Sequence, residues 1–110
     1  MVYINTKLMS LFVVGSLATS LYAMQPSFDC SKVEKNSTEA IICSSEELMK
    51  LDNELAGLYK IVLKHSSNPK LLKAEQRGWI KGRNDCWKAE NEKKCIADEY
   101  KFRINQLKDR

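Results

Sequence analysis

The sequence QRGWIKGRNDCW, residues 76–87, decides the fold, because it joins helical periodicity with both tryptophans and one of the four cysteines. On a helical wheel its apolar residues, with one from the preceding turn, fall on a single side. These residues are Leu72, Trp79, Ile80, Cys86 and Trp87. Gln76 and Arg83 fall in the middle of this apolar stripe. A buried arginine must be paired and hydrogen-bonded, so the stretch predicts a central helix and a carboxylate partner for Arg83 elsewhere in the chain.

The strongest helical signal lies before this helix, between residues 45 and 64. Apolar residues recur there at alternating spacings of three and four. The apolar positions are Leu48, Leu51, Leu55, Leu58 and Val62, with Tyr59 beside them, and the solvent side carries Glu46, Lys50, Gly57 and Lys64. A short connection follows, in which Asn68 suits a helix N-cap and Pro69 the first helical position. The pattern predicts two antiparallel helices.

The register of this hairpin offers a partner for the central arginine. If the turn is centred near residue 66 or 67, Asp52 faces residue 81, and Arg83 lies within one turn of that position. The sequence therefore predicts a structural Asp52–Arg83 ion pair, with a solvent-facing Arg83 as the alternative. A single Asp and Arg without a nucleophile or base carry no chemistry of their own. The hairpin also predicts that Leu55, Tyr59 and Trp79 are buried together.

Two segments precede the first long helix. Residues 26–37 are rich in turn formers and charges, which is typical of an irregular arm. Thr38 to Cys43 is expected to form a short helix. Ser44, followed three residues later by Glu47, has the pattern of a capping box that starts the next helix.

The last helix is expected to run from Lys94 to Leu107. One face carries Ile96, Tyr100, Ile104 and Leu107, with Arg103 among them. Phe102 lies outside this stripe. It could cover the arm or be an exposed contact, and we favour packing against the arm around Phe28. The sequence thus predicts an all-α fold, a small disulfide-stapled bundle of three main helices and a short leading helix.

Residues 1–23 have the features of a secretory signal peptide. One cation, Lys7, precedes an apolar run from residue 8 to residue 23. The run is shorter than the ~20 apolar residues of a membrane-spanning helix. We expect cleavage after Ala23, with a cut after Ser20 or an uncleaved anchor as alternatives. The sequence predicts a periplasmic or secreted protein, with residues 24–110 as one domain and no stable membrane span after cleavage.

The domain left after cleavage is small and mildly basic. Lys7 is the only charged residue of the leader, so the 18 basic and 14 acidic residues of the chain leave a net charge of +3. A chain of this size buries a limited core and gains from cross-links. Four cysteines, Cys30, Cys43, Cys86 and Cys95, lie in the domain, without the close pairs of zinc or redox motifs. Three pairings are open, and the short loops favour Cys30–Cys43 and Cys86–Cys95.

Four cations, which we name the basic ridge, fall within a narrow sector opposite the apolar stripe of the central helix. They are Lys70, Arg77, Lys81 and Lys88. One interpretation is a solubilising face balanced by acids of the neighbouring helix. The other is a binding surface for lipopolysaccharide, peptidoglycan carboxylates or an enzyme cleft lined with acids. On the flank, Gly78 and Gly82 either permit close approach of a neighbouring helix or are tolerated because the disulfides hold the domain.

The sequence gives no support for catalysis. The single His65 lies in a connection and the cysteines are expected to be oxidised, so no nucleophile and base can be assembled. Glu46, Glu47 and Glu54 are typical of a solvated helix face. We therefore expect no catalytic residue, no metal, no cofactor and no nucleic-acid partner, and a monomer.

Several short motifs, taken together, resemble the LprI-type lysozyme-inhibitor family. They are Phe28-Asp29-Cys30, Ala40-Ile41-Ile42-Cys43, Leu51-Asp52-x-Glu54-Leu55 with Tyr59, Gln76-Arg77-x-Trp79-x3-Arg83-x2-Cys86, and Cys95-x4-Tyr100-x2-Arg103-Ile104. The resemblance runs from about residue 26 to residue 107. It implies a compact, cysteine-stapled helical domain with a role in the cell envelope. The chain lacks the lipobox of the founding type, which leaves membrane tethering open.

The resemblance favours inhibition of lysozyme or a related peptidoglycan-cleaving enzyme. Such an inhibitor would insert a cation, from the basic ridge or from the turn at residues 88–94, between the two catalytic carboxylates of the enzyme. The alternative is a non-catalytic envelope module that binds an anionic glycan or a partner protein through the basic ridge.

Overall fold

The computed structural model describes residues 24–110, and the predicted signal peptide, residues 1–23, lies outside the described residues. The described part contains the helices α2 (Thr38–Cys43), α3 (Glu46–His65), α4 (Pro69–Asn84) and α5 (Glu92–Lys108), and the 3-10 turns η1 (Cys30–Lys32) and η2 (Asp85–Lys88). The predicted all-α bundle of three main helices and a short leading helix is confirmed. No helix in this part of the chain is both long and apolar enough to cross a membrane.

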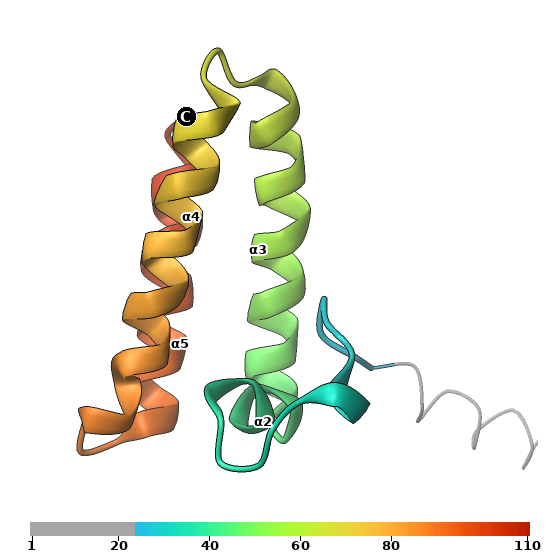
Figure 1. Cartoon of the computed structure of the whole chain (residues 1–110), viewed down its shortest axis with the longest axis vertical. Helices are drawn as coiled ribbons and strands as arrows, with labels where there is room; N and C mark the ends of the chain where they lie inside the picture. The colour runs from blue at the N-terminus through green and yellow to red at the C-terminus, as the bar shows by residue number, and fades with distance from the viewer. Residues whose placement is uncertain (1–23) are drawn as a thin grey trace, which may run out of the picture.

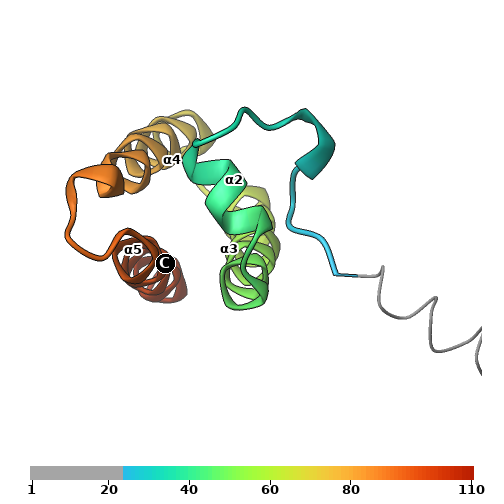
Figure 2. The ribbon, with the colours of Figure 1, turned by 90° about the horizontal axis from the view of Figure 1, so that it is seen from below.

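The three long helices run up, down and up. α3 and α4 stand side by side as an antiparallel hairpin, and α5 lies behind α4 (Figure 1). Seen from below, the three helices occupy the corners of a triangle, and α2 lies across the lower end of the bundle (Figure 2). α5 packs most extensively against α3, although these two helices are not neighbours in the sequence.

Side-chain caps define the first residue of three helices, α2, α4 and α5. Ser37 Oγ accepts a hydrogen bond from Ala40 N at 3.1 Å, and Asn68 Oδ1 accepts one from Leu71 N at 3.1 Å. Asn91 caps α5 in the same way and places its start two residues before the expected Lys94. Each cap satisfies one of the amide donors that a helix start leaves unpaired.

The predicted capping box at Ser44 and Glu47 is wrong by one residue. Ser45 caps α3, because its Oγ accepts from Leu48 N at 3.3 Å. Ser44 instead belongs to the end of α2, where its Oγ donates to Ile41 O at 2.7 Å. Ser44 thus caps the end of α2, and the adjacent Ser45 caps the start of α3.

The core lies where α5 meets α3 and α4. Its fully buried members include Ile42, Leu48, Leu72, Ile96, Tyr100 and Leu107. Leu55 is buried as predicted, whereas Tyr59 and Trp79 are only partly buried and pack against the core. Trp79 meets Tyr100 edge to face, with ring centroids 5.0 Å apart, and donates its indole N–H to Glu99 O at 3.0 Å. The aromatic pair therefore joins α4 to α5.

The helical wheel misplaced two apolar residues of the central stretch, Trp87 and Ile80. α4 ends at Asn84 and the chain tightens into η2, so the periodicity of α4 no longer applies to Trp87. The Trp87 side chain is 66% exposed, and Ile80 lies at the bundle rim at 36%. Cys86 is buried, as predicted.

The favoured position of Phe102 is wrong, and one of the two interpretations of the glycine pair is excluded. Phe102 is 60% exposed on α5 and does not cover the arm, while Phe28 packs against the core from the arm itself. Gly78 and Gly82 do not permit close approach of a helix, since a Cβ added at either position would meet no atom within 4 Å. Both glycines face solvent.

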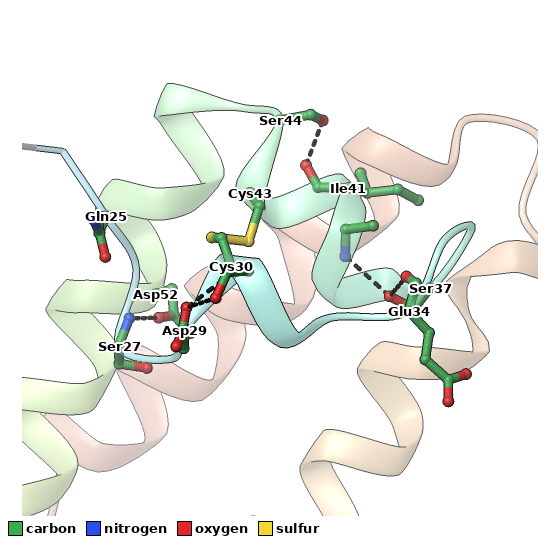
Figure 3. The surroundings of a disulfide bond; sticks show 12 residues. Gln25, Ser27, Asp29, Cys30, Glu34, Ser37, Ile41, Cys43, Ser44 and Asp52 are labelled. Atoms are coloured by element: carbon green, nitrogen blue, oxygen red, sulfur yellow. Dashed lines mark hydrogen bonds between the residues drawn. A yellow bond between two sulfur atoms is a disulfide. The ribbon is translucent and has the colours of Figure 1, made fainter. Parts of the chain in front are cut away.

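The disulfides are Cys30–Cys43 and Cys86–Cys95, which is the predicted pairing of neighbours. The first holds the arm to α2, and the second closes the turn between η2 and α5. The arm is also hydrogen-bonded to α3, because Ser27 N donates to Asp52 Oδ2 at 2.6 Å (Figure 3) and Asn53 Nδ2 donates to Gln25 O at 2.6 Å. Both cross-links lie at the lower end of the bundle.

Candidate functional site

Arg83 is the centre of a buried polar network at the lower end of the bundle. Its guanidinium is surrounded by side chains of α2, α4 and α5, and the residue is only 5% exposed. Nη2 donates to Glu39 Oε2 at 2.7 Å and to Asn84 Oδ1 at 2.9 Å, while Nη1 donates to Tyr100 Oη at 3.0 Å. Charge-assisted bonds of this kind compensate the desolvation of a buried arginine.

Asp52 reaches Arg83 through Tyr100 and not directly. The Tyr100 hydroxyl accepts from Arg83 and donates to Asp52 Oδ1 at 2.7 Å. The predicted Asp52–Arg83 pair is therefore corrected: both residues are buried, but the ion-pair partner of Arg83 is Glu39. The hairpin register placed Asp52 correctly at the height of Arg83, but it took no account of a third helix that fills the space between them.

The environment of Tyr100 favours the neutral phenol. Burial is the largest cause and raises the pKa of Tyr100 far above its usual value. The charge of Arg83 acts against this rise and lowers the pKa, while the Asp52 carboxylate raises it. The Arg83 guanidinium also lies over two aromatic rings, 5.7 Å from the Trp79 centroid and 5.9 Å from that of Tyr100. The polar groups of this network hold four elements together.

Sequence reasoning missed Glu39, Tyr100 and Asn84 as members of the network. A signal was present for Tyr100, because a phenol in an apolar helical stripe needs a hydrogen-bond partner when it is buried. No such signal pointed to Glu39, because an acidic residue is common in the first turn of a helix.

A large cleft opens between α3, α4 and the arm, and we call it the main cleft. Its volume is about 850 Å³, within the range of small-molecule sites. Leu55, Ala56 and Leu63 of α3 and Ile80 of α4 supply apolar walls, and Arg83, Glu39 and Asp52 form a polar floor. These floor groups are already engaged with one another, with Tyr100 or with the arm.

A second buried arginine, Arg103, lies higher in the bundle and is 3% exposed. Nε donates to Gln76 Oε1 at 2.9 Å and Nη1 to Gln106 Oε1 at 3.2 Å. Nη2 has no hydrogen-bond partner among the described residues. Glu75 does not hydrogen-bond to it, since that carboxylate pairs with Arg110. Burial lowers the pKa of Arg103, and the charge of Glu75 opposes this with a smaller rise. Gln76 lies in the middle of the apolar stripe of α4 because it is the hydrogen-bond partner of Arg103.

The basic ridge is only partly a helical face. Lys70, Arg77 and Lys81 are exposed on the outer side of α4. Lys88 lies beyond the helix end in η2, where its Nζ is 3.7 Å from Asp85 Oδ1 and 5.5 Å from the Trp87 ring centroid. Within residues 24–110 there is no group of three His, Cys, Asp or Glu residues placed to hold a metal ion.

These features define a small disulfide-bridged helical bundle whose buried charges join its helices. The chain belongs to the LprI family, because the family model described as "Lysozyme inhibitor LprI" matches residues 30–107. Curated relatives are the proteins named "Lipoprotein LprI" of Mycobacterium bovis and of Mycobacterium tuberculosis, each 28% identical over 81 residues. The match covers 74% of this chain but 40% of each relative, so the chain spans well under half of their length. No solved structure matches the chain.

Proposed function

We propose that this protein is an exported cell-envelope inhibitor of lysozyme or of a related peptidoglycan-cleaving enzyme. The observation that carries the proposal is the family match over residues 30–107, which includes both disulfides and the helices α2 to α5 except for the last residue of α5. The proposed role is binding without catalysis. Export is supported by the leader-like composition of residues 1–23 and by two disulfides, which persist in oxidising compartments.

The contact surface that we propose is the basic ridge. Lys70, Arg77 and Lys81 are exposed on one side of α4 and have no ion-pair partner among the described residues. Glycosidases of the two-carboxylate type present a pair of acids in their cleft, which a cation held on a rigid helix can occupy. The net charge of +3 does not steer the domain toward a basic lysozyme, so inhibition depends on local fit.

A lysozyme assay with the purified protein tests the proposal. Charge reversal of the ridge by Lys70→Glu, Arg77→Glu, Lys81→Glu and Lys88→Glu should abolish inhibition, and inhibition by the parent should weaken with salt. The matched control reverses four exposed cations outside the ridge and the turn at residues 88–94, Lys35, Lys60, Lys64 and Lys101, and so makes the same change in net charge. Inhibition by the control should survive.

The assay also separates the alternative function, a non-catalytic module that binds an anionic envelope glycan through the ridge. Its support is the same set of exposed cations. Absence of inhibition, together with ridge-dependent retention on peptidoglycan, would favour that module over an inhibitor. If inhibition survives charge reversal of the ridge, the contact surface is instead the disulfide-closed turn at residues 88–94.

A further inference from the structure

A second, smaller cavity lies at the lower end of the bundle, where four helix ends meet. Its volume is about 290 Å³, and it is lined by residues 36–39, Asn84, Trp87 and Glu92. The segment entering α2 passes beside the end of α4 there, and η2 leads into α5 (Figure 2). The cavity is thus built from segments far apart in the sequence. Trp87 is its only large apolar side chain.

Trp87 is exposed but held in place. Its side chain is 66% exposed, yet its neighbour Cys86 is buried and bonded to Cys95. The Lys88 ammonium lies 5.5 Å from the ring centroid. An exposed indole on a cross-linked turn loses little conformational freedom when it binds a partner. The ring is therefore suited to act as a fixed stacking surface.

The polar lining of the cavity is positioned by the buried Arg83. Asn84 Oδ1 accepts from Arg83 Nε at 3.1 Å and from Nη2 at 2.9 Å, which directs the remaining amide donors of Asn84 elsewhere. Glu39 uses Oε2 for Arg83, so its second oxygen still has acceptor capacity. Glu92 adds another half-buried carboxylate at the start of α5. Donors and acceptors of fixed geometry thus surround one aromatic ring.

We propose that this cavity binds one ring of an uncharged pyranose glycan, with Trp87 as the stacking platform. A pyranose presents an apolar face of C–H groups, whose positive hydrogens suit the negative face of an indole. Its hydroxyls are both donors and acceptors, and they match the amide and carboxylates of the lining. The volume lies at the lower end of ligand sites, which suits one sugar ring rather than a longer segment.

An apolar anchor from a protein partner fits the cavity less well. Apart from Trp87, its lining consists of amide, hydroxyl and carboxylate side chains, which a buried hydrocarbon would leave without hydrogen bonds. The proposal does not depend on inhibition of an enzyme, because it concerns direct binding of a sugar in the absence of any enzyme.

Nuclear magnetic resonance tests the site on the intact, oxidised protein. The two tryptophan indole N–H signals serve as site and internal control, since Trp79 donates to Glu99 O at the α4–α5 interface. Titration with chitotriose, an oligomer of N-acetylglucosamine, and separately with cellotriose, a glucose oligomer, distinguishes an acetylated from a plain pyranose. We expect saturable movement of the Trp87 signal with at least one sugar, while the Trp79 signal stays fixed. Salt should have little effect, because no ion pair forms.

Variants assign the binding to the stacking surface. Trp87→Ala should weaken sugar binding at least about tenfold, and Trp87→Phe, which keeps an aromatic face, should weaken it less. Phe102→Ala removes an equally exposed aromatic residue outside the cavity and should leave binding unchanged. Calorimetry measures all three, and circular dichroism checks that each variant is folded.

Two results would overturn the proposal. One is an unmoved Trp87 signal at millimolar concentrations of both sugars. The other is sugar binding that persists at parental strength in Trp87→Ala. Neither depends on the lysozyme assay, so failure here and failure of the proposed inhibition are separate outcomes.

Discussion

Arg83 and Arg103 are both buried in the apolar faces of their helices, but they meet very different surroundings. Arg83, at the lower end, has a carboxylate, an amide and a phenol as partners and two aromatic rings beside it. Arg103, in the upper half, is bonded to two glutamine oxygens, and its Nη2 atom has no partner in the described part of the chain. Arg83 therefore joins several elements, whereas the desolvation of Arg103 is less well compensated by its partners.

The difference follows from what surrounds each arginine. The lower end contains α2, the arm and both disulfides, which bring groups from distant parts of the chain to Arg83. The upper half consists only of the α3–α4 hairpin and the end of α5. With fewer segments to supply a carboxylate, Arg103 is left with neutral partners.

Replacing each arginine by methionine tests this comparison with the largest expected change in the free energy of unfolding. Arg83→Met should lower the free energy of unfolding by ~3 kcal/mol or more, because the buried Tyr100 and the half-buried Glu39 lose their partner. Arg103→Met should be neutral or stabilising, since it removes a buried charge that forms no salt bridge within residues 24–110. Urea unfolding of the two variants measures both. Equal losses would show that the two sites are energetically alike and that the contrast is wrong.

Removal of a cross-link should have the next largest effect. The double variant Cys86→Ser with Cys95→Ser opens a loop with a sequence separation of 9, and should cost ~2–3 kcal/mol. Amide hydrogen exchange should accelerate first in η2 and at the start of α5, while the α3–α4 connection stays protected. Uniform acceleration along the chain would contradict the division into two regions.

Tyr100 should give the lower end a distinctive response to alkaline pH. Its pKa is raised by burial in the folded state, whereas the unfolded phenol titrates near its usual value of about 10. Stability should thus be fully present below about pH 10 and fall above it, by up to ~1.4 kcal/mol per pH unit. Tyr100→Phe should cost ~2 kcal/mol at neutral pH and make the alkaline decline shallower. An unchanged slope in that variant would assign the decline to another group.

The smallest expected effect concerns the exposed face of α4, which connects the two regions. Gly78→Ala and Gly82→Ala should each stabilise the protein by ~1 kcal/mol, because alanine favours helix and its Cβ meets no neighbour. Thermal unfolding measures the gain. A loss of stability in either variant would mean that the added methyl group meets a neighbouring element, which contradicts the structure.

Local rules were sufficient to predict the helices. The spacing of leucines in α3, the cap at Asn68 with Pro69, and the pairing of neighbouring cysteines all depend on residues close together in the sequence. The same rules misplaced Trp87, because they extended the period of α4 beyond the residue where the helix tightens into η2. They also misjudged Phe102, since exposure of one helix face depends on whether another element covers it.

The sequence by itself determined the family, the all-α class and the presence of a buried arginine opposite Asp52. Only the tertiary structure decided that Glu39 pairs with Arg83 and that Tyr100 stands between Arg83 and Asp52. These contacts join residues 44 and 48 positions apart. Helical periodicity specifies which face of a helix is buried, whereas the partner of a buried charge depends on how three helices rotate and pack against one another.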